Sequence, residues 1–231
     1  MGLEMKSYPC NQISKIDINC KIFKIRVVES PNNNIELSWR NTTMRSLEIK
    51  ESDSVLKITD HAAIGIYGTL ALINLKKDAQ LLIKIPSNYN GKIILQTKDE
   101  SIHVSNISAN TSIGISTSTG KILLENISVN HIDIRGYAGK TEAFSLDATE
   151  SITITSKSGE IRCGLLGTEE DYTVSCMTKN RRCKQIGITG SGAKNVTLSS
   201  ELAMIQFQFQ NGISISGSLN RYNRKDSFKD W

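Results

Sequence analysis

Apolar and polar residues alternate along most of this chain, so that every second side chain falls on the same face of an extended backbone. The alternation is clear at 113–117, 121–125, 151–155 and 160–163. No capped apolar pattern with the period of a helix accompanies it. Isoleucine fills many apolar positions, and β-branched side chains suit a pleated, half-buried surface. The pattern therefore predicts an all-β protein.

A short turn rich in Ser and Thr recurs between the predicted strands at intervals of about twenty residues. Its clearest copies, at 117–120 and 156–159, read Thr-Ser-Thr-Gly and Ser-Lys-Ser-Gly. A strand–turn–strand unit that repeats at a fixed spacing is typical of a chain wound into stacked coils. We therefore expect a single-stranded parallel β-helix with about twenty residues per coil. The alternative is an antiparallel sandwich with regularly spaced strands.

The spacing also predicts which side chains stack on one another. One inward column is expected to contain Leu95, Ile115, Ile134, Ile154 and Val174. Two further pairs have the same spacing, Ile102 with Ile122 and Ile107 with Ile127. The corner position of successive coils is expected to hold Glu100, Gly120, Gly139, Gly159 and Lys179, with Ala203 near this position in a further copy. Glycine at three corners indicates either a positive φ or a corner with little room.

The repeat sets the expected domain organisation, a single elongated β domain over residues 1–231. Residues 1–80 form less regular strands that lead into the stack, and residues 81–210 form the regular coils. Residues 211–231 either close the open end of the stack or form a frayed tail. Residues 60–72 are the least readable segment, and they fit a loop that leaves the stack or a short helix.

The chain has a net charge of +5 and a pI of about 8.9. Much of the excess lies late, at Lys179, Arg181, Arg182, Lys184, Arg221, Arg224, Lys225 and Lys229. This cluster indicates either an anionic partner or a solvated turn and tail. No recognition helix or aromatic RNA-binding strand accompanies it, so we expect no nucleic-acid partner.

Five cysteines stand at Cys10, Cys20, Cys163, Cys176 and Cys183. The number is odd and no C-x-x-C occurs, which argues against zinc spacing and favours a reducing compartment. Cys163 and Cys176 lie in strand-like segments and are expected to be small core residues. The disulfide status of the five residues is left open.

Neither a signal peptide nor an apolar run long enough for a transmembrane helix is recognisable, so the chain by itself predicts a cytoplasmic protein. Asn-x-Ser/Thr triplets begin at Asn41, Asn106, Asn110, Asn126 and Asn195. In a chain so rich in Ser and Asn, such triplets are expected from composition and indicate glycosylation only weakly.

The sequence shows no constellation typical of an enzyme. Of the three histidines, His61, His103 and His131, the last two lie in alternating strands and are expected to be outward polar residues. No G-x-S-x-G elbow or P-loop is present. Glycoside hydrolysis needs two carboxylates about 5 to 9.5 Å apart, and the aligned coils stack no such pair. We therefore expect no catalytic, cofactor-binding or metal-binding residues.

The stretch 81–209 resembles the bacterial putative-adhesin family, a domain of unknown function with a β-helix fold. The resemblance lies in a strand that ends at Pro86, in Ser/Thr-Gly-Lys/Glu-Ile blocks at 118–122 and 158–161, and in Gly190-Ser-Gly192 before the strand at 196–198. It implies a right-handed, single-chain β-helix and a place at the cell envelope, and it offers no catalytic residues. These motifs specify a fold better than a function.

Two functions remain from the sequence. The first is a non-catalytic binding or structural module whose outer Ser/Thr ladders, through Thr97, Thr117 and Thr155, contact a carbohydrate, a cell-wall polymer or a protein. The second is a carbohydrate-active enzyme with acids gathered on one outer face. Oligomerisation through an end or an edge strand is a further expectation.

Overall fold

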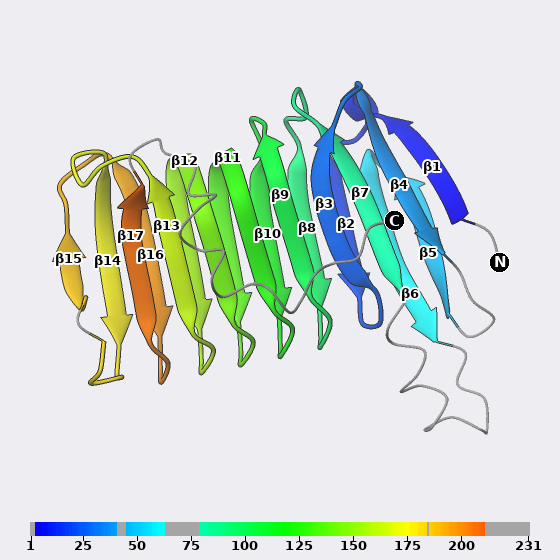
Figure 1. The fold of residues 1–231 in the computed structure, drawn as a ribbon. Coiled ribbons are helices and arrows are strands. Elements are labelled where there is room, and N and C mark those ends of the chain that lie inside the picture. Colours follow the sequence, from blue (N-terminus) through cyan, green and yellow to red (C-terminus); the bar gives the residue numbers. More distant parts are fainter. Residues whose placement is uncertain (1–2, 41–44, 63–78, 184, 211–231) are drawn as a thin grey trace.

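The computed structural model describes residues 3–40, 45–62, 79–183 and 185–210, and within them seventeen strands form one connected sheet. One 3-10 turn, η1 (Cys10–Gln12), is the sole helical element of these residues. Figure 1 shows an elongated molecule whose strands lie side by side from β1, at the N-terminal end, to β15 at the opposite end. The prediction of an all-β protein is confirmed.

The stack consists of two parallel ladders that share one apolar core. We call them the first and second ladders. The first ladder contains, in spatial order, β6 (Val55–Ala62), β2 (Lys15–Cys20), β8 (Lys92–Thr97), β10 (Ser112–Thr117), residues 131–136 and 151–156, β16 (Lys194–Ser200) and β14 (Tyr172–Thr178). The second contains β7 (Gln80–Pro86), β3 (Lys24–Ser30), β9 (Ile102–Ser108), residues 122–128 and 141–146, β13 (Ile161–Leu166) and β17 (Ile205–Gln210).

Two long strands join the ladders, because each passes from the second ladder into the first. They are β11 (Ile122–Gly136) and β12 (Thr141–Ser156). Each bends at a residue with positive φ, Asn126 and Ser145, and β9 has Asn106 at the corresponding place. The side-chain amide of Asn126 donates to Asn106 Oδ1 at 2.9 Å. Asparagine tolerates the left-handed region better than most residues, which suits Asn106 and Asn126 to this position within the second ladder.

Antiparallel strands flank the parallel stack at both ends. At the N-terminal end, β4 (Asn34–Arg40) pairs with β7 and with β1 (Leu3–Pro9), while β5 (Arg45–Ser52) pairs with β6. At the other end, β15 (Gly187–Thr189) pairs with β14. The sheet is therefore mixed, with parallel pairing confined to the coils.

The predicted apolar column is correct for its first four residues. Leu95, Ile115, Ile134 and Ile154 are in direct register and buried, as are the pairs Ile102 with Ile122 and Ile107 with Ile127. The prediction for the fifth residue, Val174, is wrong, because Ile154 stacks on Leu198, which in turn stacks on Cys176. Val174 instead pairs with Val196.

Val174 is displaced because the coils do not stack in sequence order at the ends. Strand β16 lies between β12 and β14, so a later strand separates two earlier ones. At the other end, β2 lies between β6 and β8, and β3 lies between β7 and β9. The expectation that every coil lies on its predecessor is therefore wrong outside the central coils. The strands of residues 15–30 are members of the ladders themselves.

Glycine is required at the corners because any side chain there would collide with the backbone of the neighbouring coil. A Cβ on Gly120, Gly139 or Gly159 would lie within about 2.0 Å of the carbonyl oxygen of the preceding corner residue, and none of the three has a positive φ. At Gly120, Gly159 and Ala203 a hydroxyl three residues earlier accepts the corner N–H, as Ser156 Oγ does from Gly159 at 2.8 Å. Ala203 occupies this position as expected, since its N–H donates to Ser200 Oγ at 3.0 Å.

In the part of the chain that the structure describes, β17 pairs with β13 alone, and a side chain covers its other edge. Gln185 donates from Nε2 to the carbonyl of Phe207 at 2.9 Å and accepts the N–H of Phe207 at 3.0 Å. The thiol of Cys183 donates to the carbonyl of Ile205 at 3.2 Å. The predicted roles of residues 211–231 and of residues 63–72 lie outside the described residues, whereas residues 60–62 belong to β6.

Candidate functional site

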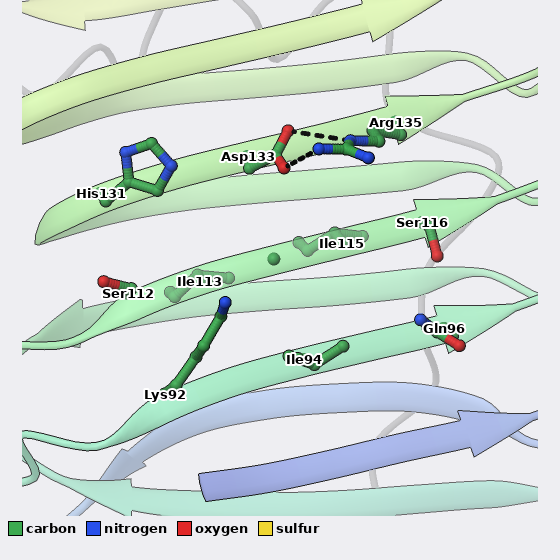
Figure 2. A pocket seen from close by; sticks show the side chains of 11 residues that line it. Lys92, Ile94, Gln96, Ser112, Ile113, Ile115, Ser116, His131, Asp133 and Arg135 are labelled. Carbon is green, nitrogen blue, oxygen red and sulfur yellow. Dashed lines mark hydrogen bonds and ion pairs between the residues drawn. The ribbon is translucent and has the colours of Figure 1, made fainter.

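A shallow groove crosses the outer face of the first ladder along β10. Its floor is formed by three small residues of β10, Ser112, Gly114 and Ser116, which alternate with the buried Ile113 and Ile115. Because strand alternation places these three residues on one face, their short side chains leave a depression between the neighbouring strands. The groove has a volume of about 270 Å³ (Figure 2).

Longer side chains of β8 and β11 form the two walls of the groove. Lys92, Ile94 and Gln96 stand in register with the floor on one side, and His131, Asp133 and Arg135 stand in register on the other. Arg135 donates to Asp133 within the same strand, with Nη2 2.8 Å from Oδ2. The groove therefore combines hydroxyl, amide, apolar and charged groups over the length of one strand.

An array of small polar residues continues the same outer face beyond the groove. Eight of the nine outward residues of three adjacent strands are Ser, Thr or Asn: Ser151, Thr153, Thr155, Asn195, Thr197, Ser199, Thr173, Ser175, with Met177 as the ninth. We call these eight residues the hydroxyl array. His131 Nδ1 lies 2.5 Å from Ser151 Oγ and so connects the array to the groove.

The hydroxyl array differs from the Ser/Thr face that the sequence suggested. Thr155 belongs to it, but Thr97 and Thr117 are only 8% and 6% exposed. They lie at corners, where Thr97 donates to the carbonyl of Glu100 at 2.8 Å. Alternation in fact places both threonines on the inward face, because each lies two residues after an inward residue, Leu95 or Ile115. The outward Ser/Thr face therefore does not include them.

The outer face of the second ladder carries a network of paired charges. Glu142 accepts from Lys121 at 2.7 Å and from Lys140 at 2.6 Å, and Lys140 also lies 3.6 Å from Glu160. Arg162 bridges the same two acids, at 2.9 Å from Glu160 and 3.8 Å from Glu142. Glu142 and Glu160 share these basic partners without being in register, because Glu142 pairs with Arg162 and Glu160 lies at the preceding corner.

These acids are arranged as ion pairs. Burial would raise the pKa of Glu142, but the hydrogen bonds from Lys121 and Lys140 outweigh it and hold the pKa below its ordinary value. A general acid in glycoside hydrolysis needs a raised pKa. Glu142 therefore has the properties of a structural carboxylate.

Each histidine is held by a neighbouring polar side chain. His103 lies on the outward side of its strand as expected, between the inward Ile102 and Val104, but it is buried there, and its Nε2 lies 2.9 Å from Glu125. This hydrogen bond is the main reason that the pKa of Glu125 is lowered. His61 contacts Glu48 at 3.1 Å, and His131 lies on the outer face as expected. Among the described residues, no group of three His, Cys, Asp or Glu side chains could hold a metal ion.

All five cysteines are buried free thiols. Cys163 and Cys176 lie in the core as predicted, where burial raises the pKa of each to about 12. A thiol with so high a pKa is a poor nucleophile, because the thiolate is the reactive form. In the part of the chain that the structure covers, no helix is long and apolar enough to span a membrane.

Comparison with known proteins begins with two solved structures. A putative cell adhesion protein from Clostridium sporogenes aligns with 12% identity and a TM-score of 0.47, covering 90% of this chain and 99% of that one. A putative adhesin from Bacteroides fragilis aligns with 11% identity and a TM-score of 0.29, covering 90% of this chain and 97% of that one. No curated protein matches the sequence.

The sequence itself gives the family. Residues 13–170 match the model described as Toastrack DUF4097, a domain of unknown function. The match runs from the first parallel strand, β2, past β13, so it includes the corner glycines and the groove, whereas β14, β16 and β17 of the two ladders follow it. The chain therefore belongs to the DUF4097 Toastrack family.

Proposed function

We propose that this protein is a non-catalytic, adhesin-like binding module that holds an extended polymer against the outer face of its first ladder. The observation that carries the proposal is the hydroxyl array, which continues directly into the groove along β10. Neighbouring rows are about 4.8 Å apart, and alternate residues of a strand are about 6.6 Å apart. Such a surface offers many regularly spaced hydrogen-bonding groups to a repeating ligand.

Several groups of the array are available for a ligand. Thr153, Thr197, Ser175 and Ser199 make no side-chain hydrogen bond with other described residues. β-Branched threonine is restricted at χ1, so less side-chain entropy is lost when it binds. Individually weak contacts can then add up to useful affinity.

We also propose the handedness of the winding, the extent of the domain and the location of the protein. The winding is right-handed, as parallel crossover connections generally are. Residues 1–231 form a single elongated unit, and the protein acts at the cell envelope, where a carbohydrate or another cell-wall polymer is its partner. Digestion of intact cells with an added protease tests the location, because only a surface-exposed protein is lost.

The binding proposal is tested with immobilised neutral and acidic polysaccharides and two matched variants. Replacing Thr153 and Thr197 together by lysine places two long charged side chains in the array and should abolish retention. The control is Gln206→Lys, which adds a charge to the exposed outer face of the second ladder and should leave retention unchanged. Equal retention of all three proteins, or no retention of the unmodified protein by any polymer, would refute the proposal.

A carbohydrate-active enzyme is the second candidate, because Glu142 and Glu160 do gather beside Lys140 and Arg162. The same polysaccharides distinguish the two functions. New reducing ends or unsaturated products that disappear in Glu142→Gln would establish the enzyme, whereas a binding module leaves polymer length unchanged.

A further inference from the structure

We propose that the Lys92 end of the groove is a subsite for a carboxylate, so that the ligand is an acidic polysaccharide. This inference rests on the proposed function and specifies its substrate class. The residues concerned are Lys92, Ser112 and His131, which stand in register on three adjacent strands, β8, β10 and β11. Together they form one end of the groove (Figure 2).

The charges around the groove are balanced except at Lys92. Lys15, its neighbour on β2, lies 2.7 Å from Asp17, and Arg135 lies 2.8 Å from Asp133. Among the described residues, Lys92 has no carboxylate within ion-pair distance. The groove therefore presents one uncompensated ammonium group, which an anionic ligand can neutralise.

The surroundings of Lys92 suit a carboxylate. Figure 2 shows the Lys92 side chain reaching from β8 toward β10 at Ile113, with Ser112 and His131 at the same end of the groove. The hydroxyl of Ser112 has no partner among the described side chains. His131 engages Ser151 through Nδ1, so its other ring nitrogen is left for a ligand. An ammonium, a hydroxyl and an imidazole are thus carried by three residues in register at one end of the groove, beside a floor of small residues.

The remainder of the face favours a polysaccharide over an acidic peptide. Peptides that bind sheets commonly add a strand to a free edge or place side chains in apolar pockets. The groove lies on the face of the ladder, and the strands on both sides of β10 are paired. The surface beside His131 is the hydroxyl array, which complements the hydroxyls of sugar rings.

Isothermal titration calorimetry of the full chain at low salt tests this assignment with three probes. They are polygalacturonate, its fully methyl-esterified form and poly-L-glutamate. Polygalacturonate should bind most tightly of the three probes. Lys92→Gln should lower the affinity for polygalacturonate about fivefold, as expected for a partly exposed ion pair. Lys92→Arg should retain most of the affinity. Lys21→Gln removes an exposed charge at the distant turn between β2 and β3 and should have no effect.

The outcomes separate this inference from the proposed function. Equal binding of the acid and the methyl ester, or full affinity in Lys92→Gln, overturns the carboxylate subsite but leaves polymer binding intact. Poly-L-glutamate binding as tightly as polygalacturonate overturns the choice of a polysaccharide. Failure of all three probes and of neutral polysaccharides overturns both proposals. Circular dichroism confirms that each variant is folded before its affinity is interpreted.

Discussion

At the scale of single residues, the stack depends on places where no Cβ fits. A Cβ on Gly139 would lie 1.9 Å from the carbonyl oxygen of Gly120, and both are backbone positions that cannot move independently of their coils. Gly139→Ala should therefore lower the free energy of unfolding by about 1–3 kcal/mol, the usual cost of overpacking. Chemical denaturation measures this loss. A Cβ on Gly114 would have its nearest atom 3.9 Å away, so Gly114→Ala should leave the free energy of unfolding unchanged. Equal losses of stability in Gly139→Ala and Gly114→Ala would contradict the account.

The hydroxyl side chains that end the strands of the first ladder, such as Thr117 and Ser156, stack in register, but Gly136 interrupts them. Gly136 lies between Thr117 and Ser156 in the register, yet the nearest atom to an added Cβ would be 3.7 Å away. In Gly136→Ser the new hydroxyl could accept the N–H of Gly139, as Thr117 accepts that of Gly120 at 3.0 Å. We expect stabilisation of about 0.5–1 kcal/mol, because the substitution also reduces the entropy of the unfolded chain.

Chemical denaturation also measures the effect of the missing hydroxyl at Gly136. The variant Gly136→Ala adds the Cβ without the hydroxyl and separates the two contributions. If Gly136→Ser proves no more stable than Gly136→Ala, the hydroxyl column has no energetic role at this corner.

The paired carboxylate of Glu142 makes stability depend on pH. Because its pKa is lower in the folded chain than in the unfolded one, it stabilises the fold above the ordinary Glu pKa of about 4.3. This contribution is lost as the pH falls through the lower pKa of the folded state. Glu142→Gln should lower the free energy of unfolding by about 1–3 kcal/mol at pH 7, since Lys121 loses its charged partner and Lys140 its nearer one. This loss of stability should be smaller in acid.

Denaturation midpoints at pH 7 and below pH 4 measure the effect of Glu142→Gln. Glu150 is exposed and makes no ion pair with the described residues, so Glu150→Gln serves as the control. A destabilisation of Glu142→Gln that is the same at both pH values would contradict the role assigned to its charge.

At the scale of elements, a side chain protects the edge of β17 that no described strand pairs with. Gln185 satisfies both backbone groups of Phe207, and an unpaired edge is a template for pairing with another chain. Gln185→Ala should cost about 1–2 kcal/mol and increase self-association. Light scattering detects the association. Gln208→Ala, which removes an exposed amide from the same strand, should behave like the unmodified protein, and an equally monomeric Gln185→Ala would argue against edge protection.

Local elements could be predicted from the sequence, but their order in space could not. The turns at 117–120 and 156–159, the glycine corners and the column from Leu95 to Ile154 follow from spacing along the chain. The insertion of β16 before β14 has no local signal, because Val196 and Val174 are equally suitable neighbours for Ile152. For the same reason nothing in the sequence singles out Gln185, whose role depends on an edge created by that insertion.

At the scale of the whole molecule, the two ladders expose different outer faces. The second ladder bears ion pairs that satisfy one another, whereas the first bears the groove and the hydroxyl array. The sequence predicted outer Ser/Thr ladders, but the site was not predictable in detail. Its residues come from strands between Lys92 and Ser199, and they share a face only once the coil order is known.

The measurement that tests the central claim most directly is a backbone amide NMR titration of the protein with polygalacturonate. We predict chemical-shift changes confined to the first ladder, at β8, β10, residues 131–136 and 151–156, and β16. Changes confined to the second ladder, or no changes at saturating polymer, would contradict the proposal that the groove and the hydroxyl array form a binding surface.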